Sequence, residues 1–207
     1  MASDLMSLFS NKKVAVDDNF FNDYAIKAQA YLNRDTFRGT PITGQMLADA
    51  AKEAYQQTGR IVPLDLALSQ AQFESSMGRT GRSPSTNPYN VGEFDEGTKQ
   101  TFKDTASGVK AYYKLMANDY LKDRTAEQLM NNFVNYRGDR YASNKLYEKK
   151  LREQSGYINR FFKNLPKEEA SSVGNMSSFS KAFADAKASG KKTFEFNGKL
   201  YTTEIKK

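Results

Sequence analysis

Apolar residues recur every three or four positions from Thr40 to about Leu165, a spacing that predicts a series of amphipathic helices. Thr43 is a suitable N-cap for one helix, which Thr58-Gly59 would end. Pro63 can open the next helix, because proline is tolerated at a helix start. The apolar face of the first of these helices would consist of Met46, Leu47, Ala50, Ala51, Ala54 and Tyr55.

Three more helices are predicted in the second half of this region. Thr125 opens the middle one, because Gln128 follows three residues later and completes a capping box ahead of Leu129 and Phe133. The last runs from about residue 144 to residue 165, with Leu151, Ile158, Phe161, Phe162 and Leu165 on its apolar stripe. The first of the three helices precedes Thr125, and its apolar side would consist of Val109, Tyr112, Tyr113, Met116 and Tyr120.

Between these helices, the sequence predicts a small β-lobe. Residues 79–90 are rich in Gly, Ser, Pro and Asn and read as a loop. Short strands are expected at Asn90–Phe94 and Thr98–Phe102, joined through Asp95-Glu96-Gly97.

The C-terminal region predicts a short helix followed by a hairpin. Ser178 can cap a helix that runs through Lys187. Asn197-Gly198 then supplies the residues of a type I′ turn, so that Phe194 would face Tyr201 across the strands. A unit this small has little core of its own, so we expect it to dock on the main domain or on a partner.

Together these elements indicate a mainly α fold of the α+β type, in four parts. Residues 1–40 read as an N-terminal arm with one amphipathic helix around Asp23–Leu32. Residues 41–165 would form the helical domain with its β-hairpin lobe. Residues 166–178 have the composition of a linker, and residues 179–207 form the C-terminal helix–hairpin unit.

The chain contains no histidine and no cysteine, which excludes whole classes of site. A serine or cysteine nucleophile would lack its histidine base, and a zinc site of the usual Cys/His type cannot form. Acid–base chemistry therefore falls to Asp, Glu, Tyr or Lys. We expect neither a metal nor a cofactor.

The 207 residues include 31 Lys and Arg against 24 Asp and Glu, a formal net charge of +7. These basic residues are scattered rather than grouped with aromatics, so no nucleic-acid partner is predicted. No apolar run reaches the length of a membrane span. The N-terminus has its apolar residues before its basic ones, the wrong order for a signal peptide, so we expect synthesis in the cytoplasm.

Glu74 is the leading candidate for a catalytic residue. In its predicted helix it shares a face with Leu64, Ala67 and Ala71 and occupies the last turn, before Gly78 can end the helix in a left-handed cap. Apolar neighbours and the negative end of the helix dipole both disfavour a charged carboxylate there. A carboxyl that keeps its proton near neutral pH is what a glycosidase uses as its general acid.

Four segments in order are similar to a known family: Ala71–Thr80 with its Glu-Ser and following Gly, Asn87–Gly92, Phe102–Tyr113 and Tyr141–Leu151. Together they resemble glycoside hydrolase family 73, the peptidoglycan N-acetylglucosaminidases. That family belongs to the lysozyme-like superfamily with the lytic transglycosylases. The resemblance spans residues 40–165.

The resemblance implies a lysozyme-like fold with a groove between two lobes. Glu74 would be the general acid, and Tyr141 would be the tyrosine close to the acid and the sugar. Pro88 stands where the family usually has an apolar residue, and Asn90 stands where it has Gly. The substrate contacts would include Ser75, Asn87, Tyr89 and Asn90, although Tyr89 and Asn90 can also serve only to form the turn.

A second catalytic carboxylate would come from the candidate hairpin, which contains Glu93, Asp95 and Glu96. Glu93 is favoured because it lies in a strand and not in the turn. In a transglycosylase-type reaction the substrate's own groups replace this carboxylate, so that one acid is enough.

The predicted activity is therefore cleavage of peptidoglycan glycan strands between GlcNAc and MurNAc. The C-terminal unit also resembles helix-plus-hairpin tails of tailed-phage virion proteins, which implies carriage by a phage particle. Other virion proteins would then bind the N-terminal arm and the C-terminal hairpin. The alternative is a non-catalytic virion structural protein or cell-wall-binding protein on a lysozyme-like scaffold.

Overall fold

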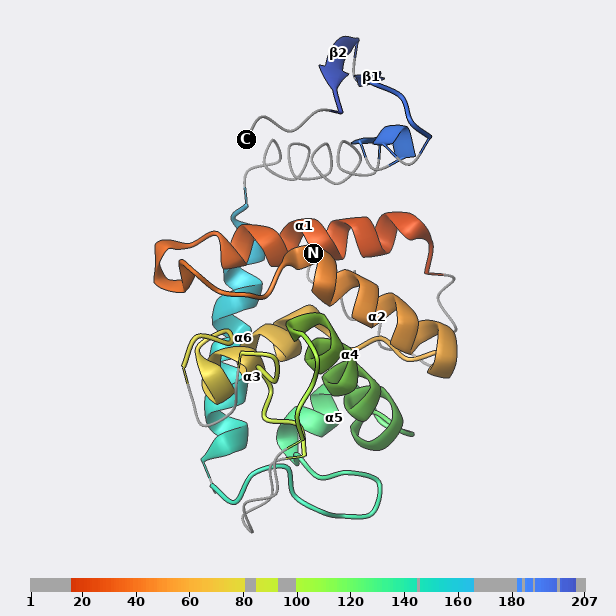
Figure 1. The fold of residues 1–207 in the computed structure, drawn as a ribbon. Coiled ribbons are helices and arrows are strands. Elements are labelled where there is room, and N and C mark those ends of the chain that lie inside the picture. The colour runs from red at the N-terminus through yellow and green to blue at the C-terminus, as the bar shows by residue number, and fades with distance from the viewer. Residues whose placement is uncertain are drawn as a thin grey trace, which may run out of the picture. The chain divides into compact units, whose positions relative to one another are not determined.

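The fold is mainly helical, and the chain divides into two compact units (Figure 1). The computed structural model describes, in the unit Met1–Leu165, residues 16–80, 85–92, 100–144 and 146–165. In the unit Pro166–Lys207 it describes residues 182–183, 185–187, 189–196 and 198–203. Within these ranges, no helix combines the length and the apolar composition that crossing a membrane requires.

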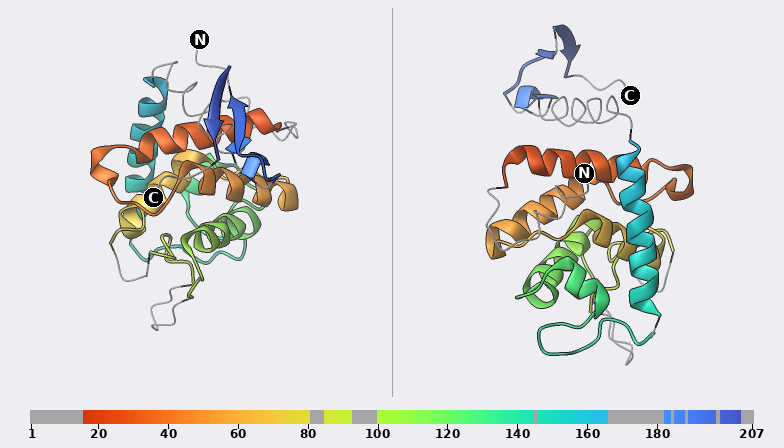
Figure 2. Two further views of the ribbon diagram at one scale, coloured as in Figure 1. Left: turned by 45° about the horizontal axis from the view of Figure 1, so that its top comes forward. Right: turned by 180° about the vertical axis from the view of Figure 1, so that it is seen from behind.

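The first unit consists mainly of helices, and α6 runs past both α3 and α1 (Figure 2). In chain order its elements are α1 (Asp18–Leu32), the 3-10 turn η2 (Asp35–Phe37), α2 (Gly44–Thr58), α3 (Leu64–Ser75), α4 (Thr105–Leu115), the π-helical turn η3 (Met116–Tyr120), α5 (Ala126–Asn131) and α6 (Tyr147–Lys163).

Local capping chemistry sets several of these boundaries, as predicted. The Thr43 hydroxyl accepts a hydrogen bond from the Met46 N–H at 3.2 Å and starts α2. Gly59 ends α2 in the left-handed conformation, with φ of 70°. Thr125 and Gln128 form the expected capping box at the start of α5.

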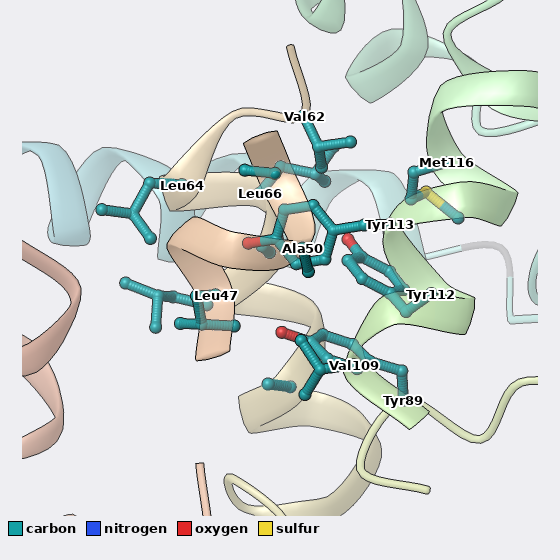
Figure 3. Close-up of a cluster of buried hydrophobic side chains, with 14 of the residues drawn as sticks. Leu47, Ala50, Val62, Leu64, Leu66, Tyr89, Val109, Tyr112, Tyr113 and Met116 are labelled. Atoms are coloured by element: carbon teal, nitrogen blue, oxygen red, sulfur yellow. The ribbon is translucent and has the colours of Figure 1, made fainter. Parts of the chain in front are cut away.

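α3 lies in the core of the first unit and is buried on nearly every side. Leu66, Leu68 and Ala71 have no exposed surface. Tyr112 and Tyr113 of α4 are also fully buried, so the expectation of a packed apolar side for this helix is confirmed. Figure 3 shows how side chains of α2, of the segment around Val62 and of α4 meet here.

Side-chain hydrogen bonds hold both ends of α3 against its neighbours. At the start, the Asp65 carboxylate accepts hydrogen bonds from Ser155 of α6 and, at 2.9 Å, from Asn159. Near the end, the side-chain oxygen Oε1 of Gln72 accepts hydrogen bonds from the Tyr31 hydroxyl of α1 at 3.0 Å and from the Gln154 side-chain amide of α6 at 2.9 Å. The direction of α3, and with it the placement of its last turn, is therefore fixed by two other helices.

The structure does not separate an N-terminal arm from the helical domain, which corrects the boundary expected at residue 40. α1 packs along α2 and contributes buried Tyr24, Ala28 and Tyr31 to the common core. The contact is close, because a Cβ atom at Gly44 would lie 2.2 Å from the Ala25 carbonyl oxygen. The apolar face of α1 is thus part of the same core. Residues 1–15 lie outside the described residues.

The described parts of the expected β-lobe are not strands. Residues 90–92 form a turn, and residues 100–102 adopt no strand conformation. Asn90 and Gly92 have positive φ angles of 52° and 69°, which an extended strand cannot contain. Residues 93–99, with the expected turn, lie outside the described residues.

In the second unit, the hairpin forms as predicted. β1 (Thr193–Phe196) pairs in antiparallel fashion with β2 (Lys199–Thr202), and Phe194 lies opposite Tyr201. Their rings stack with centroids 5.7 Å apart. The expected linker, residues 166–178, lies outside the described residues.

Gly108 of α4 gives a test of the packing beneath the loop formed by residues 87–91. A Cβ atom at this position would lie 2.0 Å from the Thr86 carbonyl oxygen and 3.2 Å from the Asn87 Cα, so Gly108→Ala must displace this backbone. We expect the free energy of unfolding in urea to fall by about 1–3 kcal/mol.

Gly156→Ala is the matched control. This helical glycine of α6 has space, since its added Cβ would meet only the Arg160 Nη1 atom, at 3.7 Å. We expect a gain of about 0.5–1 kcal/mol from helix propensity. Equal effects of the two substitutions would contradict the close approach at Gly108.

Candidate functional site

Glu74 is the penultimate residue of α3, and its side chain is half-buried. Its Oε2 atom accepts a hydrogen bond of 2.9 Å from the Asn90 side-chain amide. The same amide nitrogen donates to the Glu74 backbone carbonyl at 3.2 Å. The helix end and the loop at residues 87–91, here called the 87–91 loop, therefore meet at this carboxylate.

Immediately after Glu74 the chain reverses direction through a left-handed turn. Ser76, Met77 and Gly78 have φ angles of 48°, 63° and 77°. Gly78 was expected to end the helix as a left-handed cap. It is left-handed, but α3 already ends at Ser75, and Ser76 and Met77 are left-handed as well. Left-handed residues other than Gly, Asn and Asp carry strain of about 1–2 kcal/mol each, so the surroundings must hold this turn in place.

The Ser75 hydroxyl helps to stabilise this left-handed turn. It donates to the Pro88 carbonyl oxygen at 2.6 Å and accepts from the Gly78 N–H at 2.7 Å. Ser75 is only 4% exposed. Its predicted role in binding substrate is therefore corrected to a structural one, because its hydrogen-bonding groups face the protein.

The 87–91 loop is organised by its own first residue. The Asn87 side chain donates to the Val91 carbonyl at 3.0 Å and accepts from the Val91 N–H at 2.9 Å, and it also donates to the Gln100 carbonyl. Asn87 is 1% exposed and Tyr89 is fully buried. These two predicted substrate contacts instead fix the loop, Tyr89 by stacking on Tyr112 at a centroid separation of 3.7 Å.

Tyr141 lies next to the 87–91 loop. Its hydroxyl donates to the Tyr89 carbonyl at 3.1 Å, and its ring stacks on Tyr147 at 5.8 Å. Burial raises the pKa of Tyr141 well above its ordinary value, and Tyr147 and the charge of Glu74 raise it further. Burial followed by Glu74 raises the pKa of Tyr147 in the same way. Both phenols therefore remain neutral at pH 7.

Gln70 connects these tyrosines beneath the site, and the sequence reading did not single it out. Its side chain donates to the Tyr147 hydroxyl at 2.8 Å and accepts from the Tyr112 hydroxyl. Gln70 has no exposed surface. The sequence did contain an indication of Gln70, because it is a polar residue four positions before Glu74 on the same helix face.

A second carboxylate, Glu148 at the start of α6, stabilises the neighbouring backbone. Burial raises the pKa of Glu148, but hydrogen bonds from the backbone N–H groups of Glu148 and Phe133 outweigh it, together with Arg140. The net result is a pKa below the ordinary value. The Arg140 guanidinium lies 2.7 Å from Glu148 Oε1, so this carboxylate is engaged in an ion pair.

Of the predicted site residues, the structure brings together Glu74, Asn90 and Tyr141. Ser75, Asn87 and Tyr89 support them from inside the protein. Glu93, with Asp95 and Glu96, lies outside the described residues. The shallow surface hollow between α2 and α4 is lined by Glu53, Lys110 and their neighbours and does not include Glu74.

The Ser75 hydroxyl can be tested by Ser75→Ala. The substitution leaves the buried Gly78 N–H and the Pro88 carbonyl without this partner, so we expect the free energy of unfolding to fall by about 1–3 kcal/mol. Ser69→Ala on the same helix is the control, because that buried hydroxyl bonds only the Asp65 carbonyl one turn back. A loss at Ser69 as large as that at Ser75 would refute the structural role of Ser75.

Glu148 predicts a pH-dependent contribution to stability. A carboxyl whose folded pKa is lowered stabilises the protein above its ordinary pKa of 4.5 and loses this effect as the pH falls below it. We expect Glu148→Gln to cost about 1 kcal/mol at pH 7 in urea unfolding and the difference from wild type to narrow below about pH 4. Glu153→Gln, at an exposed carboxylate of the same helix, is the control and should change the free energy of unfolding at pH 7 by less than about 0.5 kcal/mol.

Comparisons of the chain with protein-family models, with curated proteins and with solved structures found no match. The chemistry of this site follows from its own residues. These are a half-buried carboxylate at the end of a central helix, an amide that binds it, and neutral phenols beside it.

Proposed function

We propose that the chain is a peptidoglycan glycosidase that cleaves the glycan strand between GlcNAc and MurNAc, with Glu74 as its general acid. The single observation that supports this most is the position of Glu74. It lies half-buried at the negative end of α3, held by Asn90 and close enough to Tyr141 and Tyr147 to raise their pKa values.

In this reaction the protonated Glu74 carboxyl gives its proton to the glycosidic oxygen while the bond from that oxygen to the anomeric carbon breaks. The leaving sugar departs with a new hydroxyl group, and Glu74 is left as a carboxylate. The neutral phenols contribute polar but uncharged surroundings, so they do not compete for the proton.

Two routes then complete the reaction at the cationic sugar. A second carboxylate from Glu93, Asp95 or Glu96 can take a proton from water as the water attacks. Alternatively, the muramyl 6-hydroxyl of the substrate attacks and gives its proton to the Glu74 carboxylate. In the other variant the N-acetyl oxygen attacks first, and water then opens this intermediate and gives its proton to the Glu74 carboxylate, so that no second carboxylate is needed. We further propose that a phage particle carries the protein for local penetration of the cell wall.

A second candidate function is a non-catalytic virion structural protein or cell-wall-binding protein. One observation favours it: Ser75, Asn87 and Tyr89, three of the four predicted substrate contacts, are buried. Such a protein would bind sacculi or a virion partner and release no products.

The proposal is tested by digesting purified sacculi and identifying the products by mass spectrometry. Removal of a general acid typically costs 10²–10⁴-fold, so we expect Glu74→Gln to lower the release rate by at least about 100-fold. Glu153→Gln, which removes an exposed carboxylate on α6, should retain the wild-type rate.

The products also separate the reaction types. Anhydro-muropeptides identify a transglycosylase, a reducing GlcNAc end a glucosaminidase, and a reducing MurNAc end a muramidase. Equal release by wild type and Glu74→Gln would contradict the assignment of the acid. Binding of sacculi without any release by wild type would favour the second candidate.

A further inference from the structure

Asn90 contacts Glu74 in a way that suits a positioning role. One nitrogen, Asn90 Nδ2, donates both to the Glu74 carboxylate at 2.9 Å and to the Glu74 backbone carbonyl at 3.2 Å. The backbone carbonyl belongs to α3 and does not move with the side chain. The carboxylate is therefore tied through Asn90 to a fixed point on its own helix, which restricts its rotamers.

The backbone at Asn90 fits asparagine in particular. Its φ of 52° lies in the left-handed region, where asparagine and glycine are tolerated best. Glycine would adopt the same backbone but has no side-chain amide to donate. The position requires both a left-handed backbone and a side-chain donor that reaches Glu74, and asparagine meets both requirements.

The loop that carries Asn90 is held at several points. Asn87 closes it, Ser75 binds its Pro88 carbonyl, and Tyr141 binds its Tyr89 carbonyl. Asn90 itself donates its backbone N–H to the Asn87 carbonyl at 3.3 Å. The amide that meets Glu74 is therefore presented by a fixed backbone.

Several ionisable groups belong to the elements near Glu74. Tyr141 and Tyr147 interact with its charge and are neutral, and the buried Tyr89 lies in the 87–91 loop. From α6, Glu148 is paired with Arg140. Glu93, Asp95 and Glu96 follow Asn90 along the chain and lie outside the described residues. The Asn90 side-chain amide donates a hydrogen bond to the Glu74 carboxylate.

We propose that Asn90 is a positioning residue that orients the Glu74 carboxyl and favours its ionised form, and that it does not act as a substrate contact. A donor to a carboxylate stabilises the charged state, whereas half-burial and the end of α3 disfavour it. Asn90 thus limits how tightly Glu74 holds its proton. This inference rests on the proposed function for its catalytic meaning, but the contact can be tested without activity.

The decisive experiment is an NMR titration of the full chain labelled with ¹³C at the glutamate carboxyl carbon, with Glu74→Gln used to identify the Glu74 signal. We expect Asn90→Gly to raise the titration midpoint of Glu74 by about one to two pH units, the size expected for losing one hydrogen bond to a charged group. Glycine keeps the left-handed backbone without strain.

Asn90→Asp provides a second variant of nearly the same shape. It exchanges the donor for another acceptor, so Glu74 and the new carboxyl should titrate as a coupled pair with one step raised further. Asp123→Gly is the matched control, because Asp123 is exposed and also left-handed, with φ of 60°. A Glu74 midpoint that is unchanged or lowered in Asn90→Gly or in Asn90→Asp would overturn the inference.

Sacculus digestion supplies an independent readout. A general acid works in its protonated form, so a higher midpoint should extend the activity of Asn90→Gly to higher pH and move the alkaline limb of the rate profile upward. If Asn90→Gly instead needs a higher sacculus concentration for half-maximal rate and its pH–rate profile does not move, Asn90 is a substrate contact and the positioning role is refuted. If wild type itself releases no products, the proposed function fails, and the NMR titration still decides the role of Asn90.

Discussion

The candidate site depends on one buried hydroxyl group, that of Ser75. It joins the last turn of α3, the left-handed turn that follows and the carbonyl of Pro88 through hydrogen bonds of 2.6 and 2.7 Å. It supports three successive left-handed residues after a helix, together with the backbone hydrogen bonds of Ser76 and Met77 to α3. With it, the side chain before Ser75 and the amide two residues after Pro88 are brought together.

The rest of the first unit serves to keep that connection rigid. α1 and α6 fix α3 at both of its ends, and α4 approaches the 87–91 loop so closely that only glycine fits at residue 108. The π-helical turn after α4 brings Tyr120 against Tyr141, with ring centroids 5.5 Å apart. The packing of these described residues thus orients the polar groups of the site.

The sequence predicted what local chemistry decides. The caps at Thr43, Gly59 and Thr125 act within a few residues, so their patterns predicted the ends of α2 and the start of α5 correctly. The placement of Glu74 at the end of an apolar helix followed from periodicity in the same way.

What the sequence did not reveal depends on contacts between distant residues. Polar residues near a candidate acid suggested ligand contacts, but Ser75 and Asn87 satisfy their hydrogen bonds with backbone groups that only the folded loop supplies. The strand expected from Asn90 is wrong at its described residues for a related reason, since Asn90 and Gly92 adopt positive φ angles that no apolar pattern encodes. Gln70 escaped notice because its partners, Tyr112 and Tyr147, come from two other helices.

The buried tyrosines have a consequence for the behaviour of the molecule in alkali. Burial raises the pKa values of Tyr24, Tyr89, Tyr112 and Tyr113 well above that of a free phenol. The contribution of each such phenol to the free energy of unfolding is fully present below about pH 10 and decreases as the pH rises further. The reason is that the phenol loses its proton more readily in the unfolded chain. Several phenols of one core would deprotonate together on exposure, so the transition to the unfolded state in base is steep and releases protons. The contribution of these buried phenols to the response of stability to pH therefore lies in the alkaline range.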